Sequence, residues 1–188
     1  CGSGLESIAL ASYKIHAGMA DCIIAGGTES MSMVPVAGWK TALHYEIAKN
    51  HPDWYSSMGA TAEAVAHDYN ISREDQDAFS YRSHQRAIQA IESGAFKAQI
   101  VPIEVEEVYV DAAGKKKTKK HIVDTDEGPR ADTSVEALAK LKPVFAQNGT
   151  VTAGNASQTS DGAAFVMVMS GKMVKELNLQ PIARMVSH

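Results

Sequence analysis

The chain contains 188 residues, of which 45% are hydrophobic and 21% are charged, and its formal net charge is −4. This length is sufficient for one sizeable domain or for parts of two, and the composition is that of a globular protein. The negative charge excludes a general electrostatic attraction to nucleic acid or to an anionic membrane, so an anionic ligand would need a local basic cluster. We expect no nucleic acid partner.

The two cysteines, Cys1 and Cys22, are too few for a disulfide framework, which favours a reducing compartment. Cys22 lies in an apolar run and is expected to be a buried packing residue. No apolar stretch reaches the roughly 18 residues of a membrane span, and no signal peptide opens the chain. We expect no membrane insertion and a location in the cytoplasm or an organelle matrix, with any targeting segment upstream of this fragment.

The first elements predict an α/β protein. Apolar and small residues recur at helical spacing over residues 5–15, and Gly18 can end this helix. Residues 21–25 predict a short buried strand that runs into Gly26 and Gly27. Because an apolar strand after a helix favours a helix-covered parallel sheet, we expect parallel pairing here.

The next stretch lacks periodicity from residue 30 to about residue 57, so we predict a long excursion with short helical pieces. Ser72 resembles an N-cap, and the helix after it should run to residue 93 and stop at Gly94. One stripe of that helix contains Ala78, Tyr81, Gln85, Ile88 and Ile91.

A β-hairpin is predicted from residues 103–110 and 121–123, with a turn at residues 111–114. The lysine-rich run at residues 115–120 follows this turn. It is either one side of a solvated hairpin or a loose attraction for a phosphate-rich ligand.

The last third of the chain alternates between helices and strands. Residues 134–141 predict a short helix, and residues 164–169 a buried strand. Residues 171–179 predict a further helix, and residues 182–186 a strand that begins another unit.

Two stretches can carry chemistry. Cys1 stands at the start of a helix, where free N–H groups and the helix dipole favour thiolate over thiol, although an inert terminal cysteine remains the alternative. Residues 149–164 form a loop of small, hydrogen-bonding residues that can line an elongated ligand with backbone amides. An ordinary tight crossover is the alternative for this loop.

Five segments together resemble the thiolase family, in that family's order: residues 1–5 (CGSGL), 26–32 (GGTESMS), 58–63 (MGATAE), 138–145 (LAKLKPVF) and 149–164. The resemblance spans essentially the whole chain. Within it, residues 155–164 look more like the degradative 3-ketoacyl-CoA thiolases than the biosynthetic acetoacetyl-CoA enzymes.

The resemblance implies an α/β fold, namely part of the αβαβα layered thiolase fold with an inserted α+β loop domain. Residues 1–30 and 154–170 would be the second part of the N-terminal domain, and residues 31–153 the loop domain. Residues 171–188 would begin the C-terminal domain, so the chain is expected to be an internal fragment.

The resemblance also implies an acyltransferase reaction. Cys1 would attack the 3-keto carbon of a 3-ketoacyl-CoA, release acetyl-CoA and pass its acyl group to a second CoA. Met58 would line the acyl pocket, and Arg130 would lie near the nucleotide end of CoA. The pantetheine arm would be lined by Ala153, Gly154 and Ser157. CoA enters as a substrate, with no other cofactor and no metal, and a homodimer or tetramer is expected.

Some family features differ or are missing here. Ala137 stands where the family often has a serine near the adenine, and Ser57 where some members have a histidine before the pocket methionine. The family completes its site with an Asn-Glu-Ala-Phe segment, a Gly-His-Pro histidine that activates the nucleophile, and a second cysteine that acts as acid and base. None of these motifs occurs in this sequence, so the fragment alone is expected to be inactive. The other histidines should be structural or surface residues: His16, His44, His51, His67, His84 and His121.

Three alternatives stay open. One is an acetoacetyl-CoA thiolase, and another is a non-catalytic CoA-binding remnant of a thiolase. The third is an N-terminal-nucleophile hydrolase, in which the α-amino group of Cys1 would act as the base. Those hydrolases place the nucleophile on a strand, whereas the residues from Leu5 onward predict a helix.

Overall fold

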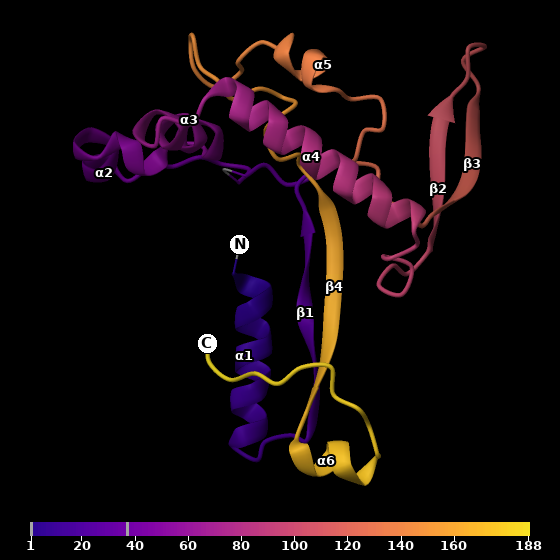
Figure 1. Cartoon of the computed structure of the whole chain (residues 1–188). Helices are drawn as coiled ribbons and strands as arrows, with labels where there is room; N and C mark the ends of the chain where they lie inside the picture. Colours follow the sequence, from indigo (N-terminus) through magenta and orange to yellow (C-terminus); the bar gives the residue numbers. More distant parts are fainter. Residues whose placement is uncertain (1, 37) are drawn as a thin grey trace. The chain divides into compact units, whose positions relative to one another are not determined.

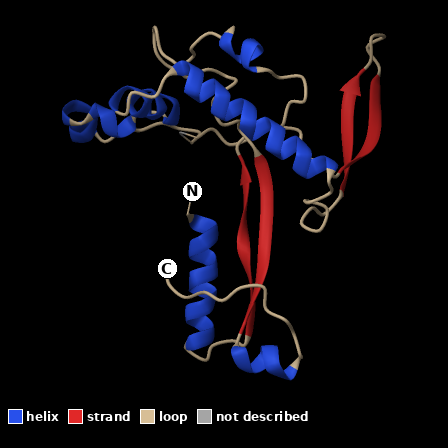
Figure 2. Cartoon of the chain, viewed as in Figure 1, coloured by secondary structure: helices blue, strands red, loops and turns tan. Residues whose placement is uncertain are grey.

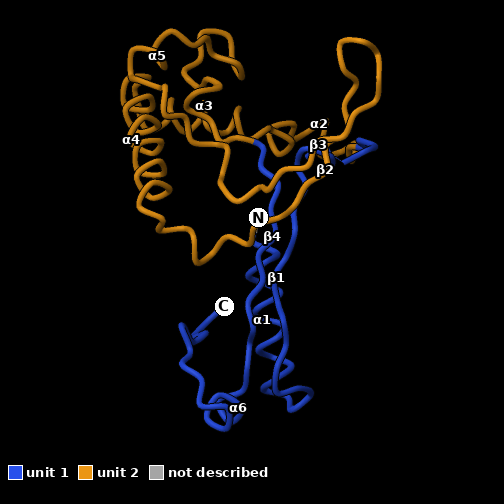
Figure 3. Tube along the Cα trace, turned by 90° about the vertical axis from the view of Figure 1, so that its right-hand side faces the viewer, with its two compact units in different colours: residues 1–42, 159–188 blue, residues 43–158 orange. Residues whose placement is uncertain are grey.

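The computed structural model describes residues 2–36 and 38–188. They form two compact units, Cys1–Ala42 with Thr159–His188 and Leu43–Gln158 (Figure 3). Both units combine helices with strands, which confirms the predicted α/β class. The predicted domain boundaries after residues 30, 153 and 170 stay predictions, because the two units reflect contacts within this chain alone.

The first unit is a helix packed on a pair of long strands. Helix α1 spans Ser3–His16 and buries small residues, among them Ala9 and Ala11, against strands β1 (Cys22–Ser30) and β4 (Asp161–Met169) (Figure 1). Small side chains allow the helix to lie close to the sheet. A short helix, α6 (Gly171–Glu176), follows β4 and begins at the N-cap Ser170.

Strand pairing in this unit corrects the expectation of a parallel sheet. β1 and β4 are antiparallel, from Cys22 opposite Met169 to Ser30 opposite Asp161. The strand and the helix before it suggest parallel pairing, whereas the partner strand lies more than a hundred residues later in the chain. Residues near one another in sequence therefore held no information on the direction of pairing.

The predicted burial of these strands is wrong for this chain. Ala25 is buried, but Ile24 is 68% exposed and Phe165 is 61% exposed. Cys22 is a half-buried free thiol, not a buried packing residue. α1 packs against this two-stranded sheet, which leaves apolar side chains of both strands in solvent. Residues 182–186, predicted as a strand, are irregular, since no segment of the described chain pairs with them.

Gly26 is needed for the close approach of β4. A Cβ at Gly26 would collide with the backbone of Ala164 and Phe165, whereas a Cβ at the neighbouring Gly27 would meet open space. Gly26→Ala should therefore destabilise the protein by about 1–3 kcal/mol, because backbone atoms cannot move aside cheaply. Urea unfolding of wild type, Gly26→Ala and Gly27→Ala measures the loss of unfolding free energy in each variant. A Gly27→Ala variant that loses as much stability as Gly26→Ala would show that the close approach of β4 does not depend on Gly26.

The second unit contains most of the helices: α2 (Tyr45–Asn50), the 3₁₀ helix η1 (Pro52–Tyr55), α3 (Met58–Asp68), α4 (Arg73–Glu92) and α5 (Val135–Ala139). The short helices α2 and η1 confirm the predicted excursion with helical pieces. Ser72 caps α4 by accepting a hydrogen bond from the N–H of Asp75, and Gly94 follows with a positive φ of 72°, as predicted.

The buried face of α4 differs from the predicted stripe. Tyr81, Ile88 and Ile91 are half-buried as expected, but Ala78 and Gln85 are exposed. The most buried residue of the helix is Asp77, at 1% exposure. Asp77 is buried because its carboxylate makes hydrogen bonds to Arg73 and Asn155. Apolar periodicity cannot detect such bonds.

The predicted hairpin is present, with β2 (Ile103–Val110) paired antiparallel to β3 (Lys116–Val123) (Figure 2). Every residue of both strands is exposed, which favours the solvated-hairpin interpretation. Lys120 lies 3.1 Å from a carboxylate oxygen of Glu104, and Lys117 lies 3.1 Å from one of Asp111. The lysine run is thus partly neutralised by neighbouring carboxylates. None of the described helices combines the length and the apolar character needed to cross a membrane.

Candidate functional site

The loop of small residues predicted to line a ligand is anchored first by Glu63 on α3. The Glu63 carboxylate accepts hydrogen bonds from the N–H groups of Thr150 and Val151, both at 2.9 Å, and from the Thr150 hydroxyl at 3.1 Å. A Cβ at Gly149 would collide with this carboxylate, so a side chain at this first residue of the loop would push Glu63 away from its partners. One side chain thereby fixes the start of the loop.

These donors also determine the protonation of Glu63. Burial raises the pKa of Glu63, but the backbone N–H donors of Thr150 and Val151 and the Thr150 hydroxyl outweigh it, so the pKa lies below its ordinary value. The carboxylate is therefore ionised at neutral pH.

Glu63→Gln should remove part of the fall in unfolding free energy that the protein shows in acid. The ionised Glu63 contributes stability that is fully present above the ordinary glutamate pKa of about 4.3 and is lost as the pH falls through the lower folded value. The gap in unfolding free energy between wild type and Glu63→Gln should therefore narrow below about pH 4.3. Urea unfolding across this range measures the gap, with the exposed Glu74→Gln as the control. A gap that stays constant in acid would contradict the role of Glu63.

The middle of the loop is held by a buried ionic network on α4. Arg73 donates from Nε to Asp77 at 2.7 Å, and from Nη2 to the carbonyl of Leu138 at 2.7 Å and that of Leu141 at 3.0 Å. The other Asp77 oxygen accepts a hydrogen bond from the Asn155 amide at 3.0 Å. α4, the end of α5 and the loop are therefore joined through one carboxylate and one guanidinium.

One further hydrogen bond holds Gly154, and a side chain would not fit at this position. The Ser80 hydroxyl on α4 donates to the Gly154 carbonyl at 2.6 Å. A Cβ at Gly154 would come within 2.5 Å of the side chains of Leu138 and Leu141. A glycine here lets the loop approach the side chains of α5 and of the residues just after it closely.

A cavity of about 440 Å³ lies against this loop. The residues of its wall that matter here are His84, Arg130, Asp132, Ala137, Ala153 and Gly154. The structure thus brings three of the predicted site residues together: Arg130, Ala153 and Gly154. Ala137, which stands where the family often has a serine, borders the same space.

Arg130 is held in place by its neighbours. Its guanidinium donates to both oxygens of Asp132, at 3.1 and 2.9 Å, and its backbone N–H donates to Nδ1 of His84 at 3.1 Å. The hydrogen bonds and the positive charge of Arg130 lower the pKa of Asp132, and the same contact raises the pKa of Arg130. The cavity wall therefore presents a charged but internally paired guanidinium.

The other predicted site residues are not in this cavity. Cys1 lies outside the described residues. Met58 is the first residue of α3 and is 74% exposed, after the N-cap Ser57. Ser157 is exposed and donates a long hydrogen bond of 3.4 Å to the carbonyl of Gln158. Neither residue is part of the cavity wall.

Sequence reasoning missed the anchors of the loop. Glu63, Asp77 and Asn155 lay inside recognised segments or helices without being assigned a role, and His84 was expected to be structural or on the surface. The available signal for Asp77 was a charged residue one helical turn before Tyr81, on the side of the predicted apolar stripe. For His84 there was none, because its partner Arg130 lies 46 residues away.

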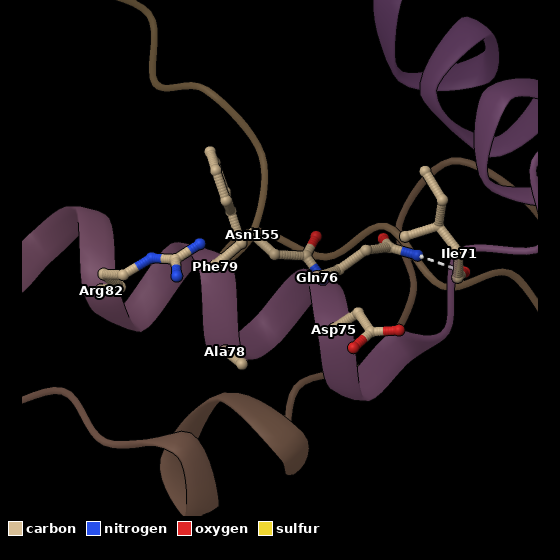
Figure 4. A pocket seen from close by; sticks show the side chains of 7 residues that line it. All are labelled: Ile71, Asp75, Gln76, Ala78, Phe79, Arg82 and Asn155. Atoms are coloured by element: carbon tan, nitrogen blue, oxygen red, sulfur yellow. Dashed lines mark hydrogen bonds between the residues drawn. The ribbon is translucent and has the colours of Figure 1, made fainter.

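A second cavity of about 560 Å³ lies along the neighbouring face of α4. Figure 4 shows its wall, which includes Gln76, Phe79, Arg82 and Asn155. Gln76 donates to the Ile71 carbonyl at 3.2 Å, drawn there as a dashed line. Residues 153–156 therefore contribute to two cavities, with Asn155 on this side and its neighbours on the other.

Known proteins are similar to this chain over nearly its whole length. Residues 1–172 match the family model described as the thiolase N-terminal domain. The chain is 49% identical over 184 residues to a 3-ketoacyl-CoA thiolase of Bacillus subtilis, covering 98% of this chain and 47% of that protein. It is 44% identical over 200 residues to an acetyl-CoA acetyltransferase of Pseudomonas aeruginosa, covering 100% and 49%. The chain spans about half the length of the curated relatives it matches.

Solved structures agree. The acetyl-CoA acetyltransferase of Bacillus anthracis superimposes with a TM-score of 0.75 at 38% identity, covering 96% of this chain and 46% of that one. The dimeric peroxisomal thiolase of Saccharomyces cerevisiae gives a TM-score of 0.78 at 36% identity, covering 95% and 44%. The predicted family and its layered fold are therefore confirmed. This chain belongs to the thiolase family.

Proposed function

We propose that the full-length protein is an acyl-CoA C-acyltransferase that cleaves 3-ketoacyl-CoA with CoA to acetyl-CoA and a shortened acyl-CoA. Membership of the thiolase family supports the reaction class. The Bacillus subtilis relative, named a 3-ketoacyl-CoA thiolase, supports the degradative direction, as do the residues of the 155–164 segment.

In the proposed reaction the Cys1 thiolate attacks the 3-keto carbon of the substrate. The bond between C2 and C3 then breaks, acetyl-CoA leaves after its carbanion takes up a proton, and the acyl group remains on sulfur as a thioester. The thiolate of a second CoA attacks this thioester and regenerates Cys1. A thiolate suits both steps because it is a good nucleophile and a good leaving group.

The observation that carries this proposal for the binding residues is the shared cavity of Arg130, Ala153 and Gly154. In our proposal the pantetheine arm lies along Ala153 and Gly154, and the nucleotide end lies near Arg130. Met58 and Ser157 are proposed to contact the acyl and pantetheine parts when the rest of the protein is present. CoA is the only small-molecule partner proposed besides the ketoacyl substrate.

An acetoacetyl-CoA thiolase is the second candidate. The Pseudomonas aeruginosa relative, named an acetyl-CoA acetyltransferase, favours it at 44% identity. The two candidates differ in the length of the acyl chain that the site accepts. A ratio of kcat/KM for 3-ketooctanoyl-CoA over acetoacetyl-CoA that lies well above one supports the degradative enzyme, and a ratio well below one supports the other.

Assembly and location are also proposals. We propose a homodimer or tetramer, since the Saccharomyces cerevisiae relative is described as dimeric. The proposed location is the cytoplasm or an organelle matrix. Light scattering of the full-length protein determines its mass, and a monomer would contradict the proposed assembly.

The direct test is an assay of the full-length protein with 3-ketooctanoyl-CoA and free CoA. The proposal expects acetyl-CoA and hexanoyl-CoA in equal amounts. The 188-residue chain alone should give neither, because it lacks the Gly-His-Pro and second-cysteine motifs. CoA binding without any cleavage by the full-length protein would favour the non-catalytic remnant.

A further inference from the structure

We propose that Ser80, Asp77 and Asn155 form a positioning group that fixes residues 153–156 as a wall for the pantetheine arm of CoA. The group acts on the affinity for CoA and leaves the chemical step unchanged. This inference rests on the proposed function, since it concerns the same ligand. None of the three side chains is proposed to touch the reacting atoms.

The burial of Asp77 is the first reason. A carboxylate at 1% exposure is costly to bury unless it is paired and hydrogen-bonded. Both of its oxygens are used, one by Arg73 and the other by Asn155. The contact with Asn155 connects helix α4 directly to the loop.

Asn155 is the second reason, because its amide closes the loop on itself. Its oxygen accepts the N–H of Thr152 at 2.7 Å, and its Nδ2 donates to the Thr150 carbonyl at 3.1 Å as well as to Asp77. Both N–H groups of this amide therefore donate a hydrogen bond. The loop conformation and the position of Asp77 are consequently linked.

Ser80 is the third reason, because it acts on the residue that borders the cavity. Its hydroxyl donates to the Gly154 carbonyl at 2.6 Å, one helical turn after Asp77. Gly154 and Ala153 form part of the cavity wall, whereas Asn155 lies on the other cavity (Figure 4). Helix α4 therefore holds this short segment at two successive residues, Gly154 and Asn155.

A protein segment that is already ordered binds the flexible pantetheine arm more tightly than a mobile segment would. The ordered segment has no conformational entropy left to lose on binding. An interaction that holds the substrate and the transition state equally changes KM without changing kcat. Loss of the Ser80 hydrogen bond should therefore raise KM for CoA about five-fold, the usual effect of one hydrogen bond.

The experiment compares four forms of the full-length protein: wild type, Ser80→Ala, Ser80→Thr and Ser83→Ala. Ser83 lies on the exposed side of the same helix, so its variant is the matched control. Calorimetric titration with CoA alone gives the affinity, thiolysis gives KM and kcat, and thermal unfolding gives stability. We expect Ser80→Ala to lose about five-fold in affinity with kcat changed less than two-fold, and Ser80→Thr to recover it.

Each other outcome has a distinct meaning. Equal CoA affinity of wild type and Ser80→Ala overturns the positioning role. A loss of kcat and stability without a selective loss of affinity makes Ser80 a structural residue only, and so does a failure of Ser80→Thr to recover the affinity. A wild-type protein that binds no CoA contradicts the proposed function itself, which the titration separates from the outcomes above.

Discussion

Replacing Cys1 with serine in the full-length protein should lower the rate of thiolysis by about 10³-fold or more. A serine hydroxyl is almost entirely protonated at neutral pH, whereas a cysteine thiol is far more acidic and can supply a substantial thiolate fraction. Serine would also form an oxygen ester, from which the acyl group transfers less readily to CoA than from a thioester. Acetyl-CoA release from 3-ketooctanoyl-CoA and CoA measures the loss.

Cys22→Ser is the matched control for this prediction. Cys22 is a half-buried thiol at the start of β1, opposite Met169. Its replacement should change the thiolysis rate by less than about two-fold, apart from a modest loss of stability. A Cys1→Ser protein that retains its rate, or a Cys22→Ser protein that loses it, would contradict the assignment of the nucleophile.

Asp77→Ala should lower the free energy of unfolding by about 3 kcal/mol or more, the usual cost of removing one partner from a buried ion pair. The change leaves Nε of Arg73 and one N–H of the Asn155 amide without an acceptor in a half-buried position. The remaining bonds of Arg73 to the carbonyls of Leu138 and Leu141 cannot replace it. Urea unfolding of the full-length protein, followed by circular dichroism, measures the loss.

Glu74→Ala provides the comparison on the same helix. Glu74 is an exposed residue of the first turn of α4, where a carboxylate contributes only about 0.5 kcal/mol through the helix dipole. Asp77→Ala should therefore be several times more destabilising than Glu74→Ala. Similar losses in the two variants would show that the Asp77 network does not hold α4, α5 and the loop together.

The sequence predicted those parts of the fold that depend on local signals. Ser72 and Gly94 bound α4 because capping and left-handed backbone have strong residue preferences. The hairpin at residues 103–123 follows from two β-prone runs around a short turn. The family resemblance then assigned the whole chain, because five short motifs appear in one order.

The remainder depends on contacts between distant residues. The antiparallel pairing of β1 with β4 joins the two ends of the chain, and residues 182–186 lack a partner in the described chain, so β-propensity alone misplaced a strand there. On α4 the inward face is set by Asp77 and Ser80 through hydrogen bonds to the loop. Apolar periodicity registers neither kind of contact.

The candidate site also combines residues with a sequence signal and residues that only the folded chain brings together. The family resemblance selected Arg130, Ala153 and Gly154, which the structure places around one cavity. Glu63 and Asn155 hold this cavity wall, and their role is visible only in the structure. Their hydrogen bonds hold the backbone of a loop that consists mostly of small residues.

The role of Cys1 as the nucleophile is tested most directly by the mass of the Cys1 peptide after reaction with 3-ketooctanoyl-CoA in the absence of free CoA. The full-length protein should release one acetyl-CoA per site and retain a hexanoyl group on Cys1, and addition of CoA should remove that group as hexanoyl-CoA. An unmodified Cys1, or a hexanoyl group on Cys22, in a protein that has released acetyl-CoA would contradict the proposed mechanism.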